Sequence, residues 1–106
     1  MKEYEVYVPR NYNDGAPVEK NKLKGIKKLL VDQFGGVTEI HLRKKGWWKM
    51  GDVLFRDKIT IFRVFAPDAR RARPFLRRLH QQLRNDLRQE EILIVEKEAK
   101  RVSFGP

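Results

Sequence analysis

The sequence predicts an α+β domain in which two helices cover one face of a four-stranded antiparallel sheet. Two segments have the apolar period of amphipathic helices, and four short segments have the composition of β-strands. These segments alternate in the order β, α, β, β, α, β, and right-handed crossovers place both helices on the same face of the sheet. At 106 residues the chain has the size of one domain, expected over residues 1–106, with residues 100–106 as a short extension or a frayed tail.

The first strand and the first helix have clear limits. Residues 3–8 are rich in β-branched and aromatic side chains, which favour a strand, and Pro9 ends it. Over residues 18–34 the apolar side chains occupy one sector of a helical projection and the lysines lie opposite. Gly35 follows, where a left-handed C-terminal cap is expected.

The middle of the chain predicts two paired strands. Residues 37–43 alternate between apolar and polar side chains, and residues 53–65 form a second apolar run that charged residues 56–58 interrupt. We expect a bulge or a late strand start at that interruption. Residues 44–51, with two tryptophans between two glycines, are expected to form a long hairpin connection.

The second helix and the last strand complete the order. Proline within a helix removes a backbone hydrogen bond, so we expect the regular helix to begin near Arg73, with Pro74 at its first position. Its leucines recur at spacings of three and four residues. Residues 91–97 form the last strand, and the whole order is that of the ferredoxin-like βαββαβ sandwich.

Composition limits the classes of function. The absence of cysteine excludes disulfides, thiolate zinc sites and cysteine nucleophiles. The N-terminus lacks the apolar stretch of a signal peptide or membrane span, so a cytoplasmic protein without a membrane partner is expected. A net charge of +10 favours DNA, RNA or another polyanion as partner, although solvated lysine and arginine also serve solubility alone.

The candidate nucleic-acid contacts are basic residues on both predicted helices and a basic and aromatic cluster in the hairpin. The arginines of the second helix lie nearly opposite its leucine stripe, as a ridge along a phosphate backbone would, or as any solvated helix face would. A tryptophan of the hairpin could stack on a base or close the end of the core. The residues are Arg70, Arg71, Arg77, Arg78, Arg84 and Arg88, then Lys24, Lys27 and Lys28, then Arg43, Lys44, Lys45, Trp47 and Trp48.

The face of the sheet away from the helices is the second candidate surface. Tyr7, His41 and Arg43 are expected there, around a candidate pocket. An apolar face of this size is usually closed by a second subunit or holds a ligand, so a homodimer or a partner protein is expected. Neither His41 nor His80 has the spacing of a metal motif, so no metal and no cofactor are expected, and no residue is assigned as catalytic.

Several segments together resemble a family of small uncharacterised bacterial ferredoxin-like proteins. The resemblance covers most of the chain and rests on YEVYVPRNYNDG, FGGVT, GWW, DKITIFRV and RQEEILIV. It implies the same fold and no established activity.

The sequence is therefore compatible with three functions. The main interpretation, which leans against an enzyme, is a basic binding or accessory module that contacts nucleic acid through its helices and assembles through its sheet. The first alternative is a dimeric ferredoxin-like enzyme or ligand-binding protein for a small molecule. The second alternative is an assembly subunit or immunity factor that binds an acidic protein.

Overall fold

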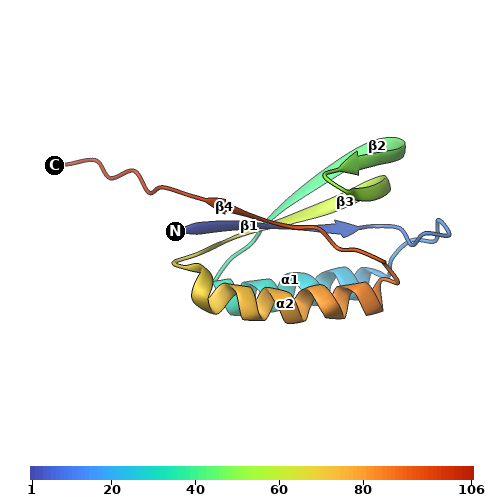
Figure 1. Cartoon of the computed structure of the whole chain (residues 1–106), viewed down its shortest axis with the longest axis horizontal. Coiled ribbons are helices and arrows are strands. Elements are labelled where there is room, and N and C mark those ends of the chain that lie inside the picture. Colours follow the sequence, from blue (N-terminus) through green and yellow to red (C-terminus); the bar gives the residue numbers. More distant parts are fainter.

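The computed structural model describes all 106 residues as one sheet with two helices beneath it (Figure 1). The sheet order is β2-β3-β1-β4, and every neighbouring pair is antiparallel. Both helices lie on the same face, so the predicted ferredoxin-like order and layering are confirmed. The elements are β1 (Lys2–Pro9), α1 (Lys20–Phe34), β2 (Thr38–Met50), β3 (Val53–Ala66), α2 (Ala69–Asp86) and β4 (Ile94–Glu98).

Helix α1 ends at the glycine that the sequence marks. Gly35 has a φ of 84°, and its N–H donates to the carbonyl of Val31 at 2.8 Å. This left-handed conformation costs a glycine little, because it has no Cβ to clash with the preceding turn. Ile26 and Leu30 are buried on the side of α1 that faces the sheet.

Helix α2 begins earlier than the sequence analysis expects. The side chain of Asp68 accepts a hydrogen bond from the backbone N–H of Arg70 at 2.9 Å and caps a helix that starts at Ala69. Pro74 therefore lies inside the helix, and the expected start near Arg73 is wrong. The cap and the burial of Ala72 against the sheet hold the first turn, although Pro74 has no N–H to donate to the previous turn.

The main core lies between the helices and the sheet. Leu76, Leu79, Leu83 and Leu87 form the buried stripe of α2 and its C-cap, at helical spacings of three and four residues. Burial of each leucine side chain contributes about 1.5–3 kcal/mol to folding. Val6 and the other inward residues of β1 form the sheet side of this core.

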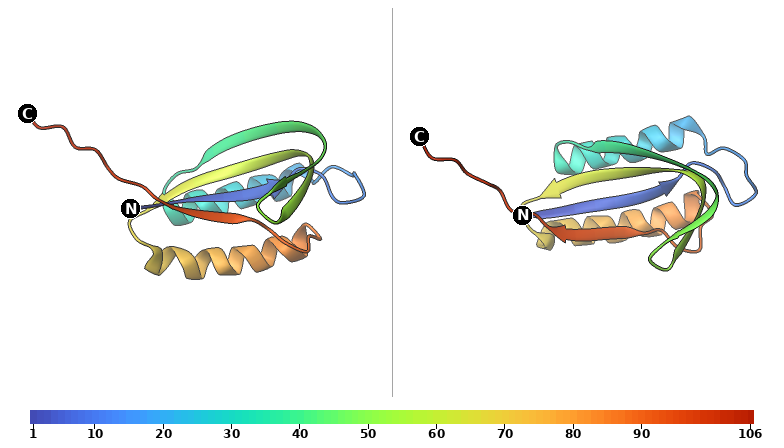
Figure 2. Two further views of the ribbon diagram at one scale, coloured as in Figure 1. Left: turned by 45° about the horizontal axis from the view of Figure 1, so that its top comes forward. Right: turned by 90° about the horizontal axis from the view of Figure 1, so that it is seen from above.

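The β2–β3 hairpin is longer than expected and curls over the other face of the sheet (Figure 2). Residues 44–50 continue β2 instead of forming a connection. The register shifts between Arg43 and Trp47, opposite Asp57, which has a φ of 56° and accepts a hydrogen bond from the Gly46 N–H at 2.8 Å. A bulge is thus present at the predicted interruption. It increases the local twist and lets the distal half of the hairpin bend back.

The hairpin builds a second apolar cluster on the face that the helices leave free. The ring of Trp48 lies 4.9 Å from that of Phe55, which lies 5.9 Å from the ring of Tyr7. Ile59 and Ile61 are buried in the same cluster. The chain itself therefore covers apolar area that the sequence analysis assigned to a second subunit, and a sheet-mediated homodimer stays a prediction.

The chain leaves the sheet after β4. The backbone N–H of Ala99 donates to the carbonyl of Met1 at 2.9 Å, and residues 100–106 then run on without helix or strand (Figure 1). Neither of the two helices combines the length and the apolar character that crossing a bilayer requires.

Candidate functional site

A polar pocket lies between α1 and the strands β2 and β3, at the edge of the sheet. Its volume is about 300 Å³, at the lower end of the range for small-molecule sites. We call it the helix–strand pocket. It is lined by Arg10, Lys20, Leu23, Lys24, Lys27, Glu39, His41, Thr60 and Phe62.

The imidazole of His41 is held in this pocket by a hydroxyl and a carboxylate. His41 and Thr60 are directly paired residues of β2 and β3, and the Thr60 Oγ1 lies 3.2 Å from the His41 Nδ1. The His41 Nε2 lies 3.4 Å from the Oε2 of Glu39, two residues earlier on the same face of β2. A donated Thr60 hydroxyl hydrogen leaves the ring proton on Nε2, toward Glu39.

Thr60 and His41 differ in their exposure to solvent, and this assigns them different roles. Thr60 is 2% exposed, so its hydroxyl orients the ring and is not available as a nucleophile. The side chain of His41 is 49% exposed. An imidazole that is open to a pocket can transfer a proton to or from a bound molecule.

The carboxylate beside His41 stays ionised. A hydrogen bond from the Lys27 ammonium, whose Nζ lies 2.7 Å from the Glu39 Oε1, holds the pKa of Glu39 below its ordinary value. The attraction of Lys27 and His41 acts in the same direction and outweighs the effect of partial burial. Glu39 therefore presents a negative charge to the imidazole of His41.

The remaining cations of the pocket have no carboxylate partner. Arg10, Lys20 and Lys24 line it without forming an ion pair. They enter it from the end of β1 and from the first two turns of α1. Unpaired positive charges around a concave surface attract an anionic group such as a phosphate or a carboxylate.

The structure does not bring the predicted sheet-face residues together. His41 pairs with Thr60, whereas Tyr7 pairs with Ile61, and successive residues of a strand point to opposite faces. Tyr7 lies in the cluster under the hairpin, while His41 faces the helices. The expected pocket of Tyr7, His41 and Arg43 is therefore wrong. Arg43 is exposed next to the bulge and does not line the helix–strand pocket.

The basic residues predicted on α2 and α1 lie on the outside of the helices but do not form one free surface. Arg70, Arg71, Arg77 and Arg78 are exposed, and Arg84 is half-buried. The guanidinium of Arg88 lies 4.5 Å from the centre of the Tyr12 ring. On α1, Lys24 and Lys27 line the helix–strand pocket, and Lys28 pairs with Asp32 at 2.9 Å.

One tryptophan of the hairpin, Trp48, has a structural role. The ring of Trp48 stacks on Phe55, and the Lys44 ammonium lies 4.7 Å from the Trp48 ring. Trp47 is 55% exposed, and Lys45 is exposed beside it. The expectation that both tryptophans lie on a connecting loop is thus wrong, because both belong to β2.

Four polar residues of the pocket were not predicted from the sequence: Arg10, Lys20, Glu39 and Thr60. Arg10 and Lys20 lie far from His41 along the chain. No local pattern marks Thr60 as the partner of His41. The only local signal is the spacing of Glu39 and His41, which share one face of a strand. The other residues meet His41 only because α1 packs against the face of β2 on which His41 lies.

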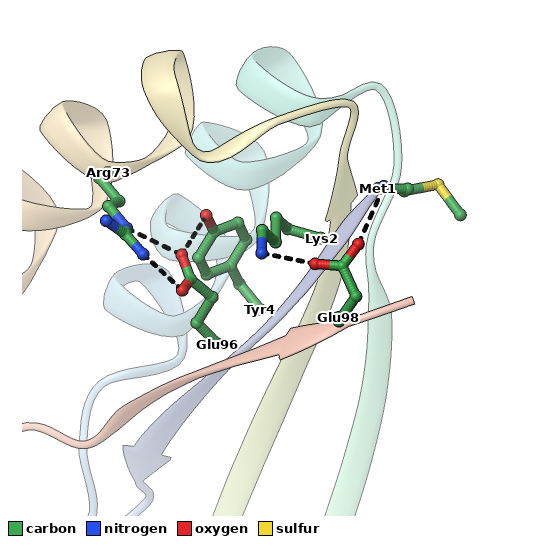
Figure 3. A network of polar contacts seen from close by, with 6 residues as sticks. All are labelled: Met1, Lys2, Tyr4, Arg73, Glu96 and Glu98. Carbon is green, nitrogen blue, oxygen red and sulfur yellow. Dashed lines mark hydrogen bonds and ion pairs between the residues drawn. The ribbon is translucent and has the colours of Figure 1, made fainter. Parts of the chain in front are cut away.

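A second polar group connects the edge strand β4 to α2 and to β1 (Figure 3). Arg73 donates to both carboxylate oxygens of Glu96, from Nε at 2.9 Å and from Nη2 at 2.6 Å, and the Tyr4 hydroxyl donates to Glu96 at 2.7 Å. The Arg73 hydrogen bonds, together with that of Tyr4, lower the pKa of Glu96 to about 2. Burial and the Glu96 charge raise the pKa of Tyr4 to about 12. We call this group the β4 clasp; Lys2 and Glu98 extend it at the end of the strand.

A third polar group lies on the far face of the sheet. Glu5 is 4% exposed and receives hydrogen bonds from Arg63 at 3.0 Å and Lys97 at 2.9 Å. Burial raises the pKa of Glu5, but these hydrogen bonds outweigh it and hold the pKa below its ordinary value. The buried charge is compensated, and loss of either cation would leave it without a full set of partners inside the sheet. No three histidine, aspartate or glutamate side chains meet as a metal site anywhere in the chain.

The element order, the strand order and the helices on one face define a ferredoxin-like α+β domain. Among solved structures, the chain is similar to a phage SAM lyase in complex with S-methyl-5′-thioadenosine, with a TM-score of 0.66 and 12% sequence identity. The match covers 92% of this chain and 80% of the lyase chain. No protein-family model matches the sequence, and comparison with curated proteins finds no match. The resemblance to the small bacterial family stays a prediction.

This comparison corrects the main functional interpretation. This solved structure, which shares the fold over most of the chain, is an enzyme in complex with a small molecule and not a nucleic-acid-binding module. The expectation of a non-enzymatic module for nucleic acid or another polyanion is therefore contradicted. At 12% identity the likeness establishes the fold, and the site must be argued from this chain's own residues.

Proposed function

We propose that this chain is a ferredoxin-like enzyme or binding protein for a small anionic molecule, held in the helix–strand pocket. The observation that carries the proposal is the placement of His41 between Thr60 and Glu39 in a concave site. The lyase with its bound S-methyl-5′-thioadenosine supports a small-molecule role for this fold.

The charges of the pocket favour an anionic ligand. Arg10, Lys20 and Lys24 attract a phosphate or carboxylate, and their positive field disfavours a ligand whose net charge is positive. His41 then lies beside the bound molecule with Glu39 behind its Nε2. The half-exposed imidazole is thus placed to contact the bound molecule and to exchange a proton with it.

A binding experiment on the whole chain tests the proposal. Amide chemical shifts are followed while ATP, a sugar phosphate, a dicarboxylate and uncharged S-methyl-5′-thioadenosine are added in turn. We expect at least one anionic compound to shift the amides around His41 and Thr60, and His41→Asn to weaken its binding. His80→Asn is the matched control, because His80 lies outside the pocket beside Glu91. Shifts that avoid this pocket for every compound would contradict the proposal.

A further inference from the structure

The C-terminal segment Lys100–Pro106 exposes its apolar side chains to solvent. Val102 is 70% exposed and Phe104 is 90% exposed. The two residues are separated by one position, so in an extended chain they lie on the same side. An extended segment that presents apolar side chains on one side can dock in a groove of a partner.

A groove with an exposed apolar surface lies at the tip of the β2–β3 hairpin. Its volume is about 400 Å³, and we call it the hairpin-tip groove. Trp47 and Leu54, 55% and 49% exposed, supply its apolar surface. It is lined by Asn13, Trp47, Asp52, Val53, Leu54, Gln89, Glu90 and Glu91.

The lining of the hairpin-tip groove contains three carboxylates and no cation, in a chain whose net charge is +10. The pockets beside α1, between the helices, beside β4 and at the start of α2 all include lysine or arginine. Glu91 is bound to His80, whereas Asp52 and Glu90 form no ion pair. The guanidinium of Arg56 lies 5.8 Å from the centre of the Trp47 ring and does not line the groove.

The C-terminal segment carries the opposite charge. Lys100 and Arg101 directly precede Val102 and Phe104, so the segment combines two cations with two apolar side chains. The groove combines unpaired carboxylates with an exposed indole and an exposed leucine. The two surfaces therefore match in both charge and polarity.

The segment cannot reach the groove of its own chain. It leaves the molecule at the end opposite the hairpin tip (Figure 1). An extended chain spans about 3.3 Å per residue, so Glu91 lies roughly 26 Å back along the chain from Ala99, whereas Phe104 reaches at most roughly 17 Å from Ala99. The groove that fits the segment must belong to another molecule.

We propose that the C-terminal segment of one copy docks in the hairpin-tip groove of a second copy. Phe104 and Val102 pack on Trp47 and Leu54, and the two cations lie beside Asp52 and Glu90. The contact is head-to-tail, because each copy donates its segment at one end and accepts a segment at the other. Repetition of such a contact closes a ring or extends a chain.

Complementary variants test this contact in sedimentation velocity experiments at several concentrations. One variant lacks residues 100–106, and the other carries Leu54→Glu in the groove with the segment intact. We expect the unmodified chain to associate, each variant alone to sediment as a monomer, and an equal mixture to form a one-to-one heterodimer. The heterodimer is the specific result, since only one segment and one groove remain intact and they belong to different molecules.

Phe65→Ala, which removes an exposed aromatic side chain outside the groove, is the matched control and should associate like the unmodified chain. Circular dichroism confirms that each variant is folded. A monomeric unmodified chain at the highest concentration would overturn the proposal, as would an oligomer that both variants leave intact. The result is independent of whether the helix–strand pocket binds a small molecule.

Discussion

The hydroxyl of Thr60 lies 3.2 Å from the Nδ1 of His41, across the pairing of β3 with β2. Thr60 is almost completely buried, whereas His41 is open to the helix–strand pocket. The pairing thus connects a rigid position of the sheet with the side chain most suited to proton transfer.

Removal of the Thr60 hydroxyl should affect ligand binding more than stability. Thr60→Val keeps the shape of the side chain but leaves the His41 ring without its orienting partner. Loss of a hydrogen bond worth about 1 kcal/mol predicts a roughly fivefold weaker affinity for the anionic ligand found by chemical-shift mapping. Calorimetric titration measures the affinity and urea denaturation the stability. Thr60→Ser, which keeps the hydroxyl, should restore most of the affinity; unchanged binding by Thr60→Val would contradict an orienting role.

The β4 clasp predicts a pH-dependent stability. The folded-state pKa of Glu96 is about 2, below its ordinary value of 4.5, so its contribution is complete above pH 4.5 and is lost as the pH falls toward 2. Glu96→Gln should therefore lower the melting temperature at pH 7, and its difference from the unmodified chain should shrink below pH 4.5. Melting curves between pH 7 and pH 2.5 measure this. Asp14→Asn, in an exposed loop, is the control; a difference that grows on acidification would contradict the assignment.

Leu83 is expected to be among the most sensitive positions of the core. Its side chain is 1% exposed in the stripe of α2 that faces the sheet. Leu83→Ala leaves a cavity and should lower the free energy of unfolding by about 2–5 kcal/mol. Urea denaturation measures the loss. Leu29→Ala, at a position 38% exposed on α1, should stay within about 0.5 kcal/mol of the unmodified chain. Equal effects of the two changes would show that the main core is placed wrongly.

Phe55 should hold the curled half of the β2–β3 hairpin. Its ring is 4% exposed between Trp48 and Tyr7. Phe55→Ala removes both aromatic contacts, so amides of residues 47–55 should exchange with solvent at least tenfold faster, while those of β1 change less. Hydrogen exchange followed by NMR measures the difference. Phe65→Ala, at an exposed position of β3, should leave the exchange of residues 47–55 unchanged. Uniform acceleration over the sheet would indicate that Phe55 stabilises the whole fold instead.

The sequence by itself determined the element order and the core-facing side of each helix. The leucine spacing of α2 and the glycine after α1 are local signals, because helical period and backbone freedom depend on neighbouring residues only. The start of α2 is not such a local signal, because the cap at Asp68 and the burial of Ala72 offset the penalty for Pro74.

Only the tertiary structure decided where the functional side chains meet. A strand pattern shows that His41 and Ile40 point to opposite faces, but not which face the helices cover. The helices cover the face of the sheet that can bury the larger apolar area. The hairpin, which curls around Phe55, covers the apolar residues of the other face. This arrangement places His41 beside Thr60 and Lys20 in a pocket, and it separates His41 from Tyr7. Such long-range packing depends on contacts between distant segments, which no local pattern in the chain contains.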